Sequence, residues 1–315
     1  MPAAFTTTSL AAGTWPGGFG VANRNLALDG SGRRSVACSN KAPACGSRAR
    51  VAGVCPCSTL GSVSAGGDGQ TGAVTPSRIE LLPIAGIPEV RPGDNLAEQI
   101  IAAADPEPGL RAGDVIVVTQ KVVSKAEGRL VPVDPTIEND HKRYVLDESV
   151  RILRRRMTPR GELIISETTH GFVCANAGID LSNIDEGWAA LLPVDSDRSA
   201  RKIRDGIRGR LGIDVGIIIS DTFGRAWRKG LTDVAIGCAG IGAVIDLRGT
   251  EDAKGRELHV TEVCLVDELA GAAELVMGKA SGIATAIVRG VDPQWLREGS
   301  VKAEVVRAPS EDLFR

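Results

Sequence analysis

Short apolar runs rich in valine, isoleucine and leucine recur along the chain from residue 79 to residue 289. Most are bounded by glycine, proline or aspartate, a pattern that is typical of β-strands rather than of helices. We expect strands at 79–84, 114–119, 162–167, 172–175, 215–220, 234–245 in two pieces, 259–263 and 284–289. A chain with this many short strands needs a sheet-based fold.

Fewer segments have the spacing of an amphipathic helix. In one of them, Ile203, Ile207 and Leu211 form a stripe at i, i+4 and i+8, and Asp195 or Ser196 can cap its start. Helices are expected at 95–104, 141–156, 199–210 and 265–277. Strands outnumber helices and do not alternate strictly with them. This favours a mixed α/β (α+β) fold over a doubly wound sheet.

The first 77 residues differ from the rest. They are rich in Gly, Ala, Ser and Thr, carry six basic residues against two acidic ones, and show no sustained periodicity. We interpret 1–77 as a low-complexity leader without ordered structure, and 78–315 as the folded domain. Nothing near the N-terminus combines a basic start with a sustained apolar segment, so a cytoplasmic location is expected.

The overall charge argues against binding to large polyanions. The formal net charge is −2, too balanced for binding to nucleic acid or to an anionic membrane through bulk electrostatics. The chain has one Tyr, five Phe and four Trp, too few for platforms that stack single-stranded bases. A small-molecule site is therefore favoured, and any phosphate must be held by local contacts.

Common nucleotide and hydrolase motifs are absent from the sequence. There is no G-x-x-x-x-G-K-[ST], no G-x-G-x-x-G that opens a helix, and no G-x-S-x-G. The seven cysteines lack the spacing of a zinc module. These absences exclude a P-loop, a Rossmann site and a recognisable nucleophilic triad.

Two acidic positions follow predicted strands. Asp180 comes shortly after the strand 172–175, and Asp221 with Thr222 comes directly after 215–220. A carboxylate at the end of a strand is rigidly held and suits a hard divalent cation that keeps several waters and binds phosphates. The competing interpretation is that each aspartate only caps a turn. Nearby, Arg225 and Arg228 have the spacing to contact phosphate or carboxylate oxygens, although loop arginines are usually solvated.

A third polar segment, 120–129, follows the predicted strand that ends at Thr119. It contains Lys121 and Lys125, and a lysine in this place can neutralise a nucleotide phosphate. The alternative is a solvated charged turn.

Several motifs occur in an order that resembles the coenzyme F420-0 γ-glutamyl ligase family. They are Ile79 to Pro88, Ser124 to Arg129, Asn176 to Asp180 with Ser182 and Asn183, Leu191 to Pro193, Ser220 to Arg225, Gly255 to Leu258, and Val288 to Gly290. The resemblance covers about 79–315, essentially the whole predicted domain. It implies a homodimeric enzyme with its own mixed α/β fold that uses GTP, Mg²⁺ or Mn²⁺, and K⁺ to add L-glutamate to coenzyme F420-0, with further γ-linked glutamates as an extension.

The resemblance also implies roles for individual residues. By position, Asp180, Asp221 and Thr222 match metal ligands of the family. The positions that match its nucleotide contacts are Ile87, Pro88, Glu89, Val90, Gln120, Lys121, Lys125, Asn183, Met277, Gly278, Lys279, Ala280, Ser281, Gly282 and Ile283. Lys279 departs from the pattern, because some relatives carry an acidic metal ligand at this place. Some relatives also continue into a flavin-binding domain, and since this chain stops at Arg315, no flavin is expected.

The chemistry implied is phosphoryl transfer followed by amide formation. The substrate carboxylate would take the γ-phosphoryl group of GTP, and the amine of glutamate would then displace phosphate. Asp180 and Asp221 would hold metal, while Lys125, Arg225 and Arg228 would offset developing charge. A metal-dependent phosphohydrolase and a non-catalytic nucleotide-binding protein are the alternatives.

Overall fold

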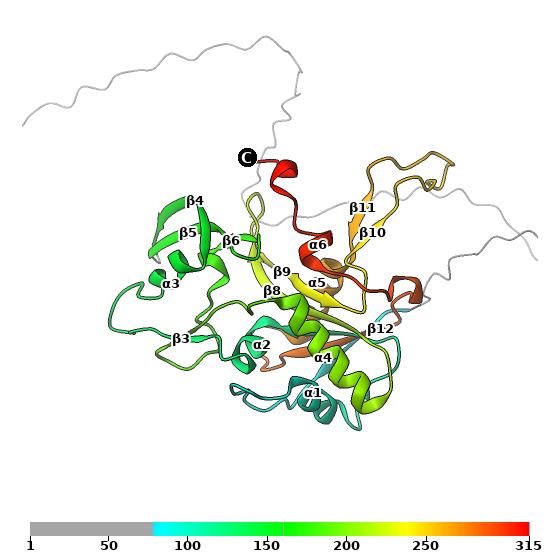
Figure 1. Cartoon of the computed structure of the whole chain (residues 1–315), viewed down its shortest axis with the longest axis horizontal. Coiled ribbons are helices and arrows are strands. Elements are labelled where there is room, and N and C mark those ends of the chain that lie inside the picture. Colours follow the sequence, from blue (N-terminus) through cyan, green and yellow to red (C-terminus); the bar gives the residue numbers. More distant parts are fainter. Residues whose placement is uncertain (1–77, 160, 315) are drawn as a thin grey trace, which may run out of the picture. The chain divides into compact units, whose positions relative to one another are not determined.

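A computed structural model of the chain describes residues 78–159 and 161–314 (Figure 1). The expectation for the leader 1–77 lies outside these residues. Among the helices of the described residues, none combines the length and the apolar character needed to cross a bilayer.

A five-stranded sheet organises the fold, in the order β1-β12-β2-β8-β9. Its strands are β1 (Glu80–Ile84), β12 (Thr285–Arg289), β2 (Val115–Thr119), β8 (Gly216–Gly224) and β9 (Leu231–Ala239). The central pair β2 and β8 is parallel, and the other neighbours are antiparallel. The sheet is therefore mixed, and the predicted mixed α/β class is confirmed.

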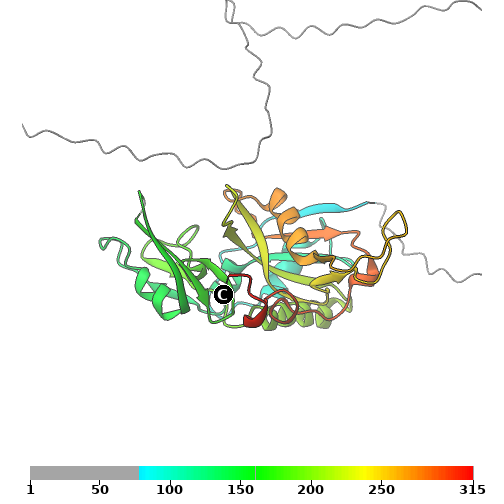
Figure 2. The same cartoon turned by 90° about the horizontal axis from the view of Figure 1, so that it is seen from above.

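Helices cover both faces of this sheet (Figure 2). They are α1 (Leu96–Ala104) and α4 (Ser196–Leu211) on one face and α5 (Leu265–Met277) on the other. Because side chains alternate along a strand, Ile116 of β2 packs toward α1 and α4, while Val117 packs toward α5. Two buried layers result, and they hold the central strands rigidly.

The helix ends follow local capping chemistry. The Asn95 side chain accepts a hydrogen bond from the backbone of Ala97, and the Asp195 side chain accepts one from Arg198. Gly212 ends α4 in the left-handed conformation, with φ 69°. The predicted bounds of α5 are confirmed, whereas α4 begins three residues before its predicted start at Ser199, because Asp195 is the cap.

Smaller sheets complete the described part of the chain. A three-stranded sheet has the order β4-β5-β6, and two-stranded sheets pair β3 with β7 and β10 with β11. The bounds are β3 (Leu130–Pro132), β4 (Ser149–Thr158), β5 (Gly161–Thr168), β6 (Val173–Ala175), β7 (Trp188–Ala190), β10 (Val244–Asp246) and β11 (Glu262–Cys264). The remaining helices are α2 (Gln120–Ala126), α3 (Lys142–Asp147) and α6 (Val301–Glu304), with 3-10 turns at Asn176–Gly178, Pro293–Trp295 and Pro309–Glu311.

Two expectations about elements are wrong. The helix predicted at 141–156 is the short helix α3 followed by strand β4, which pairs with β5. The strand predicted at 215–220 does not end at Ser220 but continues to Gly224 as one arm of a hairpin with β9. The segment 120–129, for which no element was predicted, begins with helix α2.

Candidate functional site

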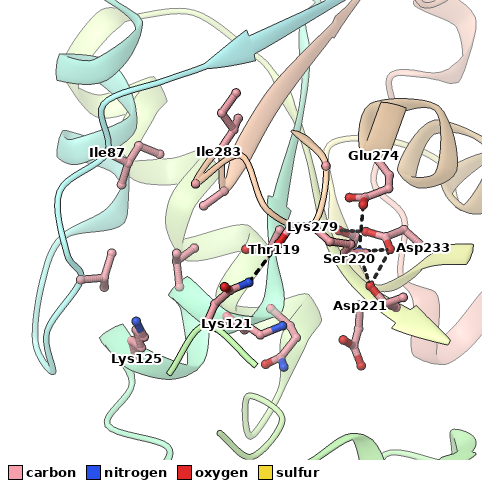
Figure 3. A pocket seen from close by; sticks show the side chains of 18 of the residues that line it. Ile87, Thr119, Lys121, Lys125, Ser220, Asp221, Asp233, Glu274, Lys279 and Ile283 are labelled. Carbon is pink, nitrogen blue, oxygen red and sulfur yellow. Dashed lines mark hydrogen bonds and ion pairs between the residues drawn. The ribbon is translucent and has the colours of Figure 1, made fainter. Parts of the chain in front are cut away.

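A pocket lies where β2 ends and α2 begins (Figure 3). The loop after β1, the start of α2, the β8–β9 hairpin and the connection from α5 to β12 supply its walls. The sequence-predicted residues that line it are Ile87, Pro88, Glu89, Val90, Gln120, Lys121, Lys125, Asn183, Asp221, Thr222, Gly278, Lys279, Gly282 and Ile283. Residues from distant parts of the sequence therefore meet in one pocket beside the carboxyl end of a central strand.

Asp221 reaches the pocket from within strand β8. The pairing of β8 with β9 shifts register between Ile219 and Ser220, because β9 has one extra residue, Ile236, at this place. Asp221 is 8% exposed, so it is a buried carboxyl group that nevertheless lines the pocket.

The surroundings of Asp221 disfavour its charged form. Burial, with smaller contributions from the negative charges of Asp180 and Asp233, raises the pKa of this carboxyl group to about 7. A backbone hydrogen bond at Thr222 and the positive charge of Lys121 act in the opposite direction.

Asp180 is held by short local contacts and by an ion pair. It follows the 3-10 turn Asn176–Gly178, forms an isolated β-bridge with Ala190, and accepts a hydrogen bond of 2.7 Å from the backbone of Ser182. The Lys121 ammonium lies 2.5 Å from its Oδ2. Burial raises the pKa of Asp180, but the charge of Lys121 and the hydrogen bonds from Lys121 and Ser182 together more than offset this, so the pKa lies below its usual value.

Helix α2 presents two lysines to the pocket. Lys121 and Lys125 are four residues apart and thus share one helical face. Lys121 pairs with Asp180, and the Lys125 ammonium lies 2.5 Å from a Glu89 oxygen. The Lys125 side chain is only 12% exposed, whereas Glu89 is 68% exposed. An anionic ligand can therefore compete with Glu89 for Lys125.

Gln120 carries an unsatisfied donor at the same place. Its side chain is 1% exposed, and its Oε1 accepts a hydrogen bond of 2.8 Å from Ser124. Its Nε2 is buried and has no hydrogen-bond partner among the described residues. Because buried donors are almost always paired, this amide fits a ligand oxygen that completes the site.

Sequence reasoning missed a second charged group in the pocket. Asp233 and Glu274 both contact Lys279, at 2.8 Å and 3.1 Å respectively. Figure 3 shows these three side chains together, on the side opposite Lys125. The hydroxyl of Thr222 donates to Asp233 at 2.6 Å and also contacts the Lys279 ammonium. A single signal was available, namely an acidic residue, Asp233, directly before the strand predicted from residue 234.

The carboxylates that remain fit one hard cation. Asp221 lines the pocket, whereas Asp180 does not and is linked to it through the ion pair with Lys121. Mg²⁺ commonly uses one or two carboxylates together with waters and substrate phosphates. The described residues contain no group of three or more His, Cys, Asp or Glu side chains arranged to hold a metal. Thr222, predicted as a ligand, instead bonds to Asp233, so its assignment stays a prediction.

Several predicted contacts lie outside the pocket. Arg225 and Arg228 are exposed in the turn between β8 and β9, where the Arg225 guanidinium donates to the Lys229 carbonyl at 2.7 Å. Because β8 continues beyond Asp221, the hairpin places both arginines outside the pocket. Met277, the last residue of α5, is fully buried in the core. Ala280 and Ser281 lie in the connection to β12 but do not line the pocket.

Comparison with known proteins gives consistent matches. The family model described as F420-0:Gamma-glutamyl ligase matches residues 85–290. A coenzyme F420:L-glutamate ligase from Methanopyrus kandleri is 43% identical over 259 residues, which cover 78% of this chain and 100% of the relative. The proteins with the same name from Methanothermobacter thermautotrophicus and Archaeoglobus fulgidus are 41% and 37% identical, over 75% and 76% of this chain and 99% and 97% of their own lengths. The matched range contains every residue that lines the pocket.

Proposed function

Because the chain belongs to the F420-0:γ-glutamyl ligase family, we propose that it joins L-glutamate to coenzyme F420-0 through an amide bond. The observation that carries this proposal is the pocket itself. It places the Asp221 carboxylate together with the ammonium groups of Lys121 and Lys125, within the range that matches the family. Asp180 does not line the pocket itself but pairs with Lys121, which does. The proposed substrates are both anionic and repel each other, so they need nearby positive charge in order to approach.

We propose GTP as the phosphoryl donor. Lys121 and Lys125 supply positive charge for phosphate oxygens, and the Gln120 amide offers its unpaired donor. Ile87 and Ile283 add apolar surface to the same pocket, which suits a nucleoside. Binding of the triphosphate would replace Glu89 as the partner of Lys125.

We propose that Asp180 and Asp221 hold Mg²⁺ or Mn²⁺ and that K⁺ assists the reaction. A bound divalent ion would screen the negative charge of the phosphate oxygens. Lys121 contacts Asp180 at 2.5 Å, so this ammonium must move aside or share the carboxylate when the ion binds. Its position on α2 keeps it within the pocket, where it can contact the nucleotide instead.

The proposed reaction has two steps. A carboxylate oxygen of coenzyme F420-0 attacks the γ-phosphorus of GTP, the bond to the β-phosphate oxygen breaks, and GDP leaves. The amine of glutamate then attacks the acyl carbonyl, inorganic phosphate leaves, and the amine loses a proton as the amide forms. The protein aligns two anions and offsets their charge, for which Lys125 is well placed at the pocket wall.

Incubation of the full chain with GTP, Mn²⁺, K⁺, L-glutamate and coenzyme F420-0 tests this proposal. We expect mass spectrometry to detect a product heavier by one glutamyl unit, together with GDP and phosphate. Phosphate release that does not require either acceptor would indicate a phosphohydrolase. Tight GTP binding without turnover would indicate a nucleotide-binding protein and would overturn the proposal.

We also propose that the chain forms a homodimer. Strand β4 is an edge strand, because it pairs with β5 on one side only. Val150 and Met157 on this strand are 67% and 75% exposed, and unpaired edges with apolar side chains favour association. A second copy of the chain would cover this surface.

A further inference from the structure

Lys279 is held like a bound cation on one side of the pocket. Its ammonium lies 2.8 Å from Asp233, 3.1 Å from Glu274 and in contact with the hydroxyl of Thr222. Three oxygen-bearing side chains from β8, β9 and α5 therefore converge on one positive group. Oxygen atoms from carboxylates and hydroxyls are also the ligands of hard metal ions.

Burial makes a positive group at this place necessary. The Asp233 side chain is 2% exposed, and that of Glu274 is 20% exposed. A buried carboxylate without a cation or hydrogen bonds is costly, and the hydroxyl of Thr222 only partly satisfies Asp233. The Lys279 ammonium supplies this positive charge through its contacts with Asp233 and Glu274.

The backbone directs Lys279 to this position. Helix α5 ends at Met277, and Gly278 adopts φ 62° and ψ 158°, which turns the chain back toward the last turn of the helix. Such a positive φ is readily adopted by glycine. The side-chain amide of Asn183 donates to the Lys279 carbonyl at 3.3 Å and so holds the turn from the other side.

The ammonium of Lys279 is separate from the proposed metal position. Lys121 pairs with Asp180 at 2.5 Å, whereas the contacts of the Lys279 ammonium are Asp233, Glu274 and Thr222. Lys279 instead neutralises the neighbouring carboxylates, Asp233 and Glu274. The β8–β9 hairpin thus carries one carboxylate of each acidic group, Asp221 on β8 and Asp233 on β9, and the group that contains Asp233 already has its cation.

We infer that the Lys279 ammonium occupies a divalent-cation position formed by Asp233, Glu274 and Thr222, so that this chain binds a metal only between Asp180 and Asp221. The second half of this statement rests on the proposed function, whereas the first does not. Lys279 is 54% exposed at its side chain, so the position stays open to ions from the pocket once the ammonium is removed.

Metal stoichiometry tests this inference without an activity measurement. We expect equilibrium dialysis against Mn²⁺ at pH 8 to give one ion per wild-type chain and two per chain of Lys279→Glu, in which three carboxylates surround the vacated position. Lys254→Glu makes the same change of charge at an exposed site in the β10–β11 hairpin. It should bind as many ions as the wild type.

The number of ions that Lys279→Glu binds, compared with the wild type, decides whether the inference holds. Equal numbers of ions in Lys279→Glu and wild type, or two ions in the wild type, would overturn the inference. No ion in the wild type but one in Lys279→Glu would support the first half of the inference, the cation position that Lys279 occupies, and would overturn the second half, the metal between Asp180 and Asp221. If Lys279→Glu does not fold by circular dichroism, Lys279→Gln provides the same test, because it removes the ammonium and adds no charge; again one additional ion is expected.

Discussion

Asp221 is a buried carboxyl group with two further carboxyl groups, Asp180 and Asp233, close enough to affect its charge. A divalent cation would relieve this repulsion, and the substrate phosphates would then bind to the same ion. When no such cation is bound, the positive charge of Lys121 offsets part of this negative charge. At the scale of single residues, the pocket is therefore organised around carboxylates that need cations.

Replacement of Asp221 by asparagine should abolish most of the ligation. Loss of one preorganised charge contact costs about 3 kcal/mol of transition-state stabilisation, roughly a hundredfold or more in rate. The fold should persist, because asparagine has nearly the same size and removes a repulsive charge. We expect glutamyl transfer at saturating Mn²⁺ to fall by at least this factor, with Asp246→Asn at an exposed position as the control. Near wild-type turnover in Asp221→Asn would show that this carboxylate does not hold the metal.

Metal binding should weaken as the pH falls below 7. The pKa of Asp221 is raised to about 7, so the proton competes with the metal below that pH, whereas the lowered pKa of Asp180 keeps this group ionised. One competing proton predicts Mn²⁺ affinity about tenfold lower at pH 6 than at pH 8. Isothermal titration calorimetry at the two pH values measures this difference. Any Mn²⁺ binding left in Asp221→Asn should lack this change, and equal wild-type affinities would contradict the assignment.

The sequence was informative about pocket residues that lie in compact motifs. Lys121, Lys125 and Asp221 were all expected at a ligand site, and the structure brings them together. Asp233 and Glu274 were missed because their approach depends on the pairing of β8 with β9 and on the packing of α5. These are contacts between distant segments, and no local spacing encodes them.

The same holds for helices and strands: an element set by its local sequence was predicted, whereas one that depends on pairing with another segment was not. Helix α5 was predicted with its bounds, because an apolar run ends at a glycine that suits a helix terminus. The helix predicted at 141–156 is wrong over most of its length, which forms strand β4. Most side chains of β4 are exposed, and this segment is a strand because it pairs with β5. Helix α2 was hard to recognise, since it is seven residues long and its polar residues face the pocket.

The central strand β8 should be the most sensitive element to loss of packing. Ile217 is fully buried between β2 and β9, in the layer that faces α1 and α4. Its replacement by alanine removes buried methylene and methyl groups and leaves a cavity, which costs about 2–5 kcal/mol. Urea unfolding measures this loss. Leu231→Ala, at a 68% exposed position on β9, should change the free energy of unfolding by less than about 1 kcal/mol. Similar losses in the two variants would contradict the described packing.

At the scale of the whole molecule, the proposed homodimer should depend on strand β4. Met157→Lys places a charge at a 75% exposed apolar position on this edge, so it should raise the dimer dissociation constant at least tenfold. Sedimentation equilibrium of the full chain measures this constant. Val260→Lys, at an 85% exposed position between β10 and β11, serves as the control. A monomeric wild type, or dissociation caused by Val260→Lys alone, would contradict this interface.

The central claim is that Asp180 and Asp221, which are far apart in the sequence, bind one divalent ion in the pocket. Anomalous diffraction at the manganese edge, from crystals of the full chain grown with Mn²⁺ and a non-hydrolysable GTP analogue, locates that ion directly. The account predicts a peak within coordination distance of an oxygen from each of the two carboxylates and of a phosphate oxygen. A manganese ion bound by only one of them, or bound elsewhere, would contradict it.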